Sequence, residues 1–113
     1  MVEMTKLGVI GNPIKHSLSP EIHTIFAREH GIDISYTKIE STIDSFNKDV
    51  EECFQNGGIG LNVTLPFKEM AYNLSNEHDD YSRKSESCNT LLKKNRNLKS
   101  FSTDGLGFFK RFI

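Results

Sequence analysis

The chain has 113 residues, a formal net charge of −1 and a hydrophobic fraction of 36%. These values fit a single domain with a modest core, and they exclude the strongly basic surface that binds nucleic acid or an anionic membrane. No stretch approaches the ~20 apolar residues that cross a bilayer, and the N-terminus lacks the apolar run of a signal peptide. We therefore expect a cytoplasmic protein with no nucleic-acid partner and no membrane.

Cysteine and histidine spacing gives no indication of a metal centre. Cys53 and Cys88 are too few and too far apart for a disulfide framework or a CxxC site. None of the four histidines has the HxxH or HExxH spacing of a zinc site. The sequence therefore predicts no metal ion, and thiols that stay reduced.

Strand-like and helix-like segments alternate along the chain, which predicts an α/β fold with a largely parallel sheet. Residues 7–10 form a short apolar run typical of a buried strand. Ser19 followed by Pro20 predicts a helix start with Ser19 as its N-cap, and Gly31 ends that helix. Residues 34–40 are β-branched and aromatic enough for a second strand.

The middle of the chain repeats the alternation. Residues 59–65 alternate apolar and polar, so a strand there places Asn62 and Thr64 on the same side. Pro66 then predicts a helix with Lys68 in its first turn. Before this strand, one face of a helix that ends at Gly57-Gly58 carries five apolar residues: Ile43, Phe46, Val50, Cys53 and Phe54.

The last third predicts an antiparallel hairpin and a final helix. Residues 88–92 and 98–102 form its strands, separated by a polar stretch. A helix from Asp104 carries an apolar stripe of Phe108, Phe109 and Phe112. We expect this stripe to pack against another domain or against a second copy of the chain.

Polar side chains gather where ligands bind in open α/β sheets, beyond the carboxyl ends of the strands. Asn62 and Thr64 lie at the end of one predicted strand, and Ser17 and Ser19 follow another. Two hydroxyls beside helix N–H groups can hold a carboxylate. The structural alternative is that Ser19 only caps its helix, Ser17 fills a loop and the Asn and Thr satisfy a turn. The residues alone favour this alternative.

Lys68 and Asp104 each have a chemical and a structural interpretation. A lysine in the first turn of a helix faces the positive end of the dipole, which suits a residue that exchanges a proton. The alternative for Lys68 is a solvated surface lysine, and for Asp104 an N-cap. No glycine cluster has GxGxxG spacing between a strand and a helix, so the chain has no predicted dinucleotide site.

Taken together, four segments resemble the substrate-binding half of the shikimate dehydrogenase family. They are residues 12–20 with Asn-Pro and Ser-x-Ser-Pro, 62–68 with Asn-Val-Thr-x-Pro-x-Lys, 89–91, and Thr-Asp-Gly at 103–105. The resemblance implies that residues 1–113 form a three-layer α-β-α domain with a mainly parallel, mixed sheet. In the family an NADP-binding Rossmann domain follows; the resemblance implies that this domain is absent from residues 1–113 and would dock through the final helix.

The resemblance also assigns roles in the site. Ser17 and Ser19 would hold the substrate carboxylate, and Asn89 would bond a ring hydroxyl. Asn62 and Thr64 would line the site. Lys68 would be the catalytic acid–base residue, paired with Asp104 around the reacting hydroxyl.

The family reaction is the NADP-linked interconversion of 3-dehydroshikimate and shikimate in aromatic amino-acid biosynthesis. The resemblance implies that shikimate or 3-dehydroshikimate binds here, that NADP binds the second domain, and that this chain alone is inactive. Two alternatives remain open. One is a stand-alone module that binds a hydroxylated ring carboxylate. The other is part of a quinate/shikimate dehydrogenase.

Overall fold

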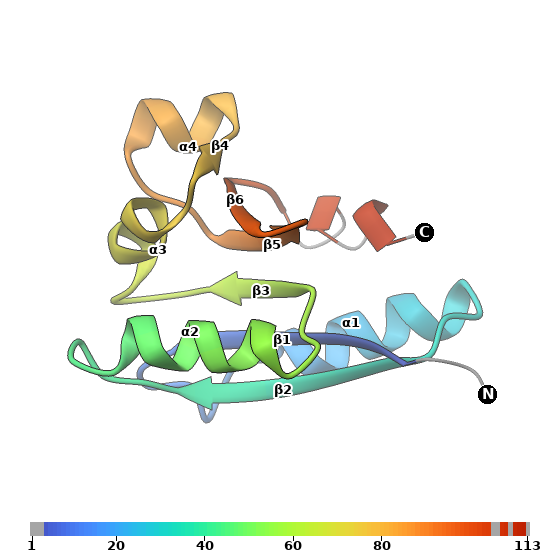
Figure 1. Ribbon diagram of the computed structural model, residues 1–113. Helices are drawn as coiled ribbons and strands as arrows, with labels where there is room; N and C mark the ends of the chain where they lie inside the picture. Colours follow the sequence, from blue (N-terminus) through green and yellow to red (C-terminus); the bar gives the residue numbers. More distant parts are fainter. Residues whose placement is uncertain (1–3, 105–106, 109, 113) are drawn as a thin grey trace.

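The computed structural model describes residues 4–104, 107, 108 and 110–112 (Figure 1). None of the described helices is long and apolar enough to cross a membrane. The elements in chain order are β1 (Thr5–Gly11), α1 (Ser19–Glu29), β2 (Ile34–Glu40), α2 (Phe46–Gln55), β3 (Gly60–Val63), α3 (Lys68–Leu74), β4 (Glu77–His78), α4 (Asp80–Ser85), β5 (Thr90–Lys94), β6 (Asn97–Phe101) and the 3-10 helix η1 (Lys110–Phe112).

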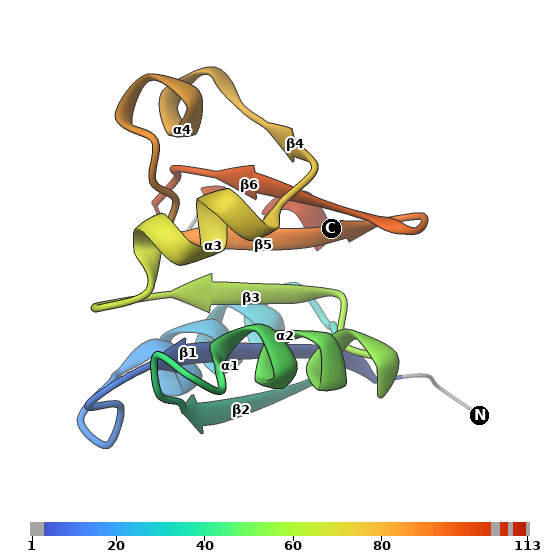
Figure 2. The same cartoon turned by 60° about the vertical axis from the view of Figure 1, so that its left-hand side comes forward.

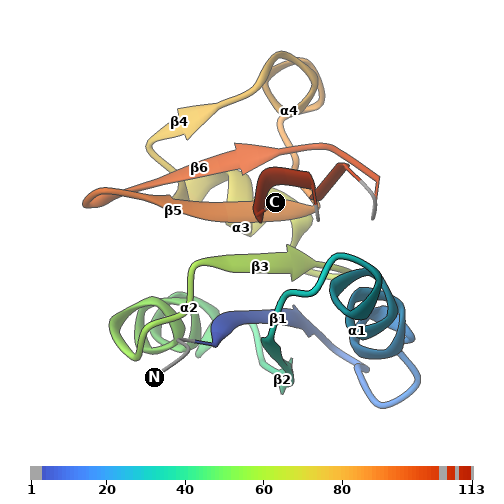
Figure 3. The ribbon, with the colours of Figure 1, turned by 90° about the vertical axis from the view of Figure 1, so that its right-hand side faces the viewer.

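The described strands form one mixed sheet in the order β2-β1-β3-β5-β6-β4. Three of the five pairings are parallel: β1 with β2, β1 with β3, and β4 with β6. The antiparallel hairpin of β5 and β6 lies beside β3 (Figure 2). Helices α1 and α2 cover opposite faces of the sheet (Figure 3). The predicted α/β fold, with its mixed sheet and hairpin, is confirmed.

The main core fills the face covered by α2 and α3. Phe46 of α2 and Phe67, just before α3, are fully buried and stack with their ring centroids 4.7 Å apart. From β3, Leu61 and Val63 point into this core, as the alternation predicts. Asn62 between them is therefore directed to the other face, where α1 lies.

Helix α1 ends as predicted. Gly31 has a φ of +67°, the left-handed conformation that glycine adopts at low cost. The Ile32 N–H donates to the Ala27 carbonyl at 2.9 Å, so the chain folds back across the last turn. The chain thus leaves α1 in the direction of β2, which begins at Ile34.

The structure departs from the predicted secondary structure at the start of α2 and at residues 77–85. Helix α2 begins at Phe46 rather than near Ile43, whose side chain is exposed, because residues 42–45 form a hydrogen-bonded turn before it. The short elements β4 and α4 were not predicted. Helix α4 has only six residues, too few for a helical period to stand out, and Asp79 caps it through the Ser82 N–H.

Candidate functional site

A pocket of about 400 Å³ opens beyond the carboxyl ends of the parallel strands β1 and β3. Its wall combines the loop before α1, the first turns of α1, the end of β3 and the start of β5. Five of the seven predicted site residues line it: Ser17, Ser19, Asn62, Thr64 and Asn89. The topology thus brings together side chains that are up to 72 positions apart in the sequence.

Ser19 does not have the N-cap role expected of it. Helix α1 begins at Ser19 itself, with Leu18 at the N-cap, and the Ser19 N–H donates to the Ser17 hydroxyl oxygen at 3.3 Å. Ser19 is therefore not the N-cap. The reason is that the Ile22 N–H already donates to the Leu18 carbonyl at 3.0 Å, so the helical pattern starts one residue earlier. The Ser19 hydroxyl is left beside the pocket.

Thr64 is placed by close contact between two loops. Its N–H donates to the Ile10 carbonyl, and the Asn12 N–H donates to the Leu65 carbonyl, both at 3.0 Å. These bonds join the loop after β1 to the loop after β3. Gly11 lies at the junction, where a Cβ atom would come within 2.2 Å of the Thr64 Cγ2 atom. Glycine is therefore required for this approach.

We expect Gly11→Ala to lower the free energy of unfolding by about 1–3 kcal/mol, because the added methyl overlaps the threonine methyl. Chemical denaturation measures the loss. The double variant Gly11→Ala/Thr64→Ser removes the methyl group that clashes, so it should recover most of the lost stability. Equal losses in the single and double variants would contradict this contact as the cause.

Two residues that support Asn62 were not predicted. The Tyr36 hydroxyl donates to the Asn62 Oδ1 atom at 2.5 Å, and the His23 ring, 2% exposed, stacks on Tyr36 with centroids 5.2 Å apart. Burial lowers the pKa of His23, an effect that hydrogen bonding to Asn62 partly offsets. A signal for His23 was available: it lies four residues after Ser19, hence on the same helix face. For Tyr36 the sequence carried none.

Asn89 holds the end of the hairpin and still faces the pocket. Its Nδ2 donates to the Thr103 carbonyl at 2.7 Å, and its Oδ1 accepts from the Thr103 N–H and the Thr90 hydroxyl, both at 3.0 Å. A carboxamide has two N–H donors, so one remains for a ligand. Thr103 thereby becomes part of the pocket wall, a placement not predicted.

The other two predicted residues, Lys68 and Asp104, do not line the pocket. Lys68 is the first residue of α3, as predicted, and its carbonyl accepts the Cys88 N–H at 3.0 Å. Burial raises the pKa of the Cys88 thiol to about 12, and the Lys68 charge partly opposes that rise. Asp104 accepts the Gly107 N–H at 2.6 Å, the geometry of an N-cap.

No hydrogen bond or ion pair joins Lys68 to Asp104 within the part of the chain that the structure describes. The two side chains are not paired in this arrangement. Their pairing around a reacting hydroxyl therefore stays a prediction.

The expected apolar stripe on the final helix needs correction. Phe108 is fully buried, and its ring lies 5.0 Å from the His23 ring. It completes the core under α1, so it offers no surface for docking. Phe109 and the side chain of Phe112 lie outside the described residues.

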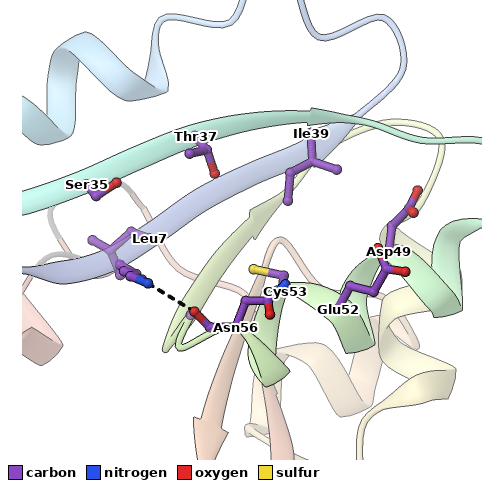
Figure 4. A pocket seen from close by; sticks show the side chains of 10 residues that line it. Leu7, Ser35, Thr37, Ile39, Asp49, Glu52, Cys53 and Asn56 are labelled. Atoms are coloured by element: carbon purple, nitrogen blue, oxygen red, sulfur yellow. Dashed lines mark hydrogen bonds between the residues drawn. The ribbon is translucent and has the colours of Figure 1, made fainter.

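A second cavity of about 400 Å³ lies on the opposite face, between β1, β2 and α2 (Figure 4). Its charged groups are already engaged: the Lys6 Nζ atom donates to the Asn56 carbonyl at 3.1 Å. The Asp49 carboxylate accepts from Ser41 at 2.6 Å and from Ser45 at 3.1 Å. None of the predicted residues lines this cavity, so the candidate site is the pocket at the strand ends.

The described residues do not fit a dinucleotide. A pyrophosphate needs a glycine-rich turn that leads from a strand into a helix N-terminus. Here Gly11 leads into the Asn12-Pro13 turn, while Gly57 and Gly58 follow α2 and lead into β3. NADP finds no such cradle in the described parts of this domain.

A mixed α/β sheet with a polar pocket beyond its parallel strands is the architecture of a domain that binds a small ligand. The family model described as "Shikimate dehydrogenase substrate binding domain" matches residues 9–91. The chain belongs to the shikimate dehydrogenase substrate-binding domain family.

Relatives agree with this family. The shikimate dehydrogenase (NADP(+)) of Hahella chejuensis is 42% identical over 107 residues, which cover 95% of this chain and 40% of that protein. The shikimate dehydrogenase (NADP(+)) of Bordetella avium is 41% identical over 111 residues, which cover 97% of this chain and 39% of that protein. Shikimate 5-dehydrogenase from Thermus thermophilus, in complex with NADP(H) and shikimate, aligns with a TM-score of 0.83 at 29% identity, covering 95% of this chain and 41% of that structure. The chain thus spans about 40% of the length of these curated relatives.

Proposed function

We propose that this chain binds shikimate or 3-dehydroshikimate as the substrate-binding domain of an NADP-linked shikimate dehydrogenase. The observation that carries the proposal is the convergence of five predicted site residues on one pocket at the strand ends. The shikimate complex of the Thermus thermophilus relative supports the choice of ligand. The NADP(+) enzymes of Hahella chejuensis and Bordetella avium support the choice of reaction.

The pocket supplies donors for the polar groups of such a ligand. The hydroxyls of Ser17 and Ser19 would donate to the carboxylate, and hydrogen bonds to a charged group contribute about 1.5–3 kcal/mol each. The remaining N–H of Asn89 would donate to a ring hydroxyl. Asn62 and Thr64 would line the opposite wall. This distribution separates the anionic end of the ligand from its hydroxylated ring.

Lys68 would act as the acid–base residue, with Asp104 beside it around the reacting oxygen. A protonated lysine there would also stabilise negative charge that develops on this oxygen. The flexible four-carbon stem of Lys68 would let its ammonium group reach toward the pocket. NADP supplies or accepts the hydride when bound, and we place its site in a part of the enzyme outside this domain.

Two exposed leucines are sequence neighbours of pocket residues: Leu18 precedes Ser19 and Leu65 follows Thr64, and they are 67% and 69% exposed. We propose that the nucleotide-binding domain docks on these two side chains. We also place the protein in the cytoplasm, because both cysteines are free thiols.

A titration of the isotope-labelled chain with shikimate, followed by amide NMR, tests the function. We expect the signals of Ser17, Ser19, Asn62 and Asn89 to shift together and saturate. The variant Ser17→Ala/Ser19→Ala should keep the dispersed spectrum of the fold and lose the response. No shift in the wild-type chain at millimolar shikimate would contradict binding by this domain. Quinate in a parallel titration distinguishes a quinate/shikimate enzyme from a shikimate enzyme.

A further inference from the structure

A buried polar cluster supports Asn62 from the side of α1 and β2. We propose that Tyr36 and His23 are positioning residues that hold the Asn62 side-chain amide with its oxygen inward and its NH₂ group toward the ligand. The wall at Asn62 then presents a hydrogen-bond donor. Its partners are ligand atoms that carry a lone pair, such as hydroxyl or carboxylate oxygens. The identity of this ligand rests on the proposed function, whereas the orientation of the amide does not.

The first step of the argument is the hydrogen bond from Tyr36. A carboxamide has one acceptor atom and one donor group, and the two differ little in shape. The Tyr36 hydroxyl donates to Oδ1 at 2.5 Å, which turns the NH₂ group away from β2. Burial raises the pKa of Tyr36, and hydrogen bonding to Ser19 partly offsets this rise. The hydroxyl therefore keeps its proton, which it donates to Asn62.

The second step is the tautomer of His23. Among the described residues its Nδ1 atom is buried without a hydrogen-bond partner. Burial lowers the pKa of the ring, and hydrogen bonding to Asn62 opposes that lowering. A neutral imidazole has one N–H and one lone pair, and a bare buried N–H is the costlier of the two to leave unpaired. We therefore assign the proton to Nε2, from which the ring can donate to Asn62 Oδ1. The oxygen would then face two donors, Tyr36 and His23. A flipped amide would place its N–H group against the N–H of His23, whereas the Tyr36 hydroxyl can accept as well as donate.

The third step is rigidity. The His23 ring stacks on Tyr36 at an interplanar angle of 16° and meets Phe26 edge-on and Phe108 at a tilt. Asn62 itself lies on β3, paired with β1 on one side and β5 on the other. Neither the backbone of Asn62 nor the rings that support it can yield easily. Such support sets the orientation of a binding side chain before the ligand arrives.

Tyr36→Phe tests the proposal, because it removes the hydroxyl and keeps the ring. We expect the Asn62 side-chain Nδ2 and Cγ resonances of the ligand-free chain to shift, and shikimate to bind about tenfold more weakly. Tyr81→Phe, on α4 and 72% exposed, is the matched control and should change neither. If Tyr36→Phe leaves the Asn62 signals in place and the affinity within twofold, the proposal is wrong.

A pair of variants at His23 separates positioning from packing. His23→Gln keeps a donor and loses the ring, whereas His23→Phe keeps the ring and loses the donor. Positioning predicts that the Asn62 signals and shikimate affinity suffer more in His23→Phe; a packing role predicts the reverse. Should the wild-type chain bind no shikimate while the Asn62 signals shift in Tyr36→Phe and not in Tyr81→Phe, the proposed function fails and the positioning role stands.

Discussion

Replacing Phe46 with alanine is expected to lower the free energy of unfolding by about 3–5 kcal/mol. The ring is fully buried at the start of α2 and stacks on Phe67, so its removal costs both apolar burial and a cavity between α2 and α3. The total free energy of unfolding of a domain of this size is about 5–15 kcal/mol. Urea denaturation followed by far-UV circular dichroism measures the change in midpoint and slope.

The matched control is Tyr81→Ala, which removes an aromatic side chain that is 72% exposed. We expect the free energy of unfolding to change by no more than about 0.5 kcal/mol. A similar loss in Phe46→Ala and Tyr81→Ala would show that the stacked pair is not the centre of the core.

The second large effect concerns Lys68. In a protein that joins this chain to the nucleotide-binding half of a relative, Lys68→Ala should lower kcat for shikimate oxidation by about 10²–10⁴-fold, the usual contribution of a general acid–base residue. The NADPH absorbance reports the rate. Shikimate binding should weaken far less, because the pocket that holds the ligand is built from other side chains.

Lys48→Ala serves as the control, since Lys48 is exposed on α2 and forms an ion pair with Glu52 at 3.9 Å. This variant should keep the wild-type rate. If Lys68→Ala also keeps that rate, the acid–base role belongs to another group and the prediction for Lys68 is wrong. A rise in the Michaelis constant alone would assign Lys68 to binding.

Local patterns were enough for the part of the site that depends on one strand or one turn. The alternation around Asn62 predicted its orientation because neighbouring residues of a strand point to opposite faces. Lys68 was predicted in the first turn of a helix opened by Pro66. Lys68 does begin α3, but Phe67 is the N-cap, so Pro66 lies before the helix rather than at its first position.

The parts that were missed depend on contacts between distant segments. Tyr36 reaches Asn62 across β1, from a strand 26 residues away, and no property of its own segment indicates this. The spacing of Phe108 and its neighbouring phenylalanines predicts an exposed apolar stripe, yet the Phe108 ring is buried and packs beside His23. Leu18 rather than Ser19 is the N-cap, because the Ile22 N–H donates to the Leu18 carbonyl and the helix therefore begins one residue earlier. Such outcomes are decided by tertiary packing rather than by local preference.

The hydrogen bonds of Asn89 have a consequence for cooperativity. The same carboxamide holds both backbone groups of Thr103 and offers its last N–H to the pocket. A ligand that takes this N–H would immobilise Asn89, and thereby tighten the anchoring of Thr103 at the end of β6. By thermodynamic reciprocity, the two binding events would affect each other equally. If the ligand strengthens the binding of a second domain at Thr103 by some factor, that domain strengthens ligand binding by the same factor. Through Asn89, ligand binding and the docking of a second domain at Thr103 would be linked by a single coupling free energy.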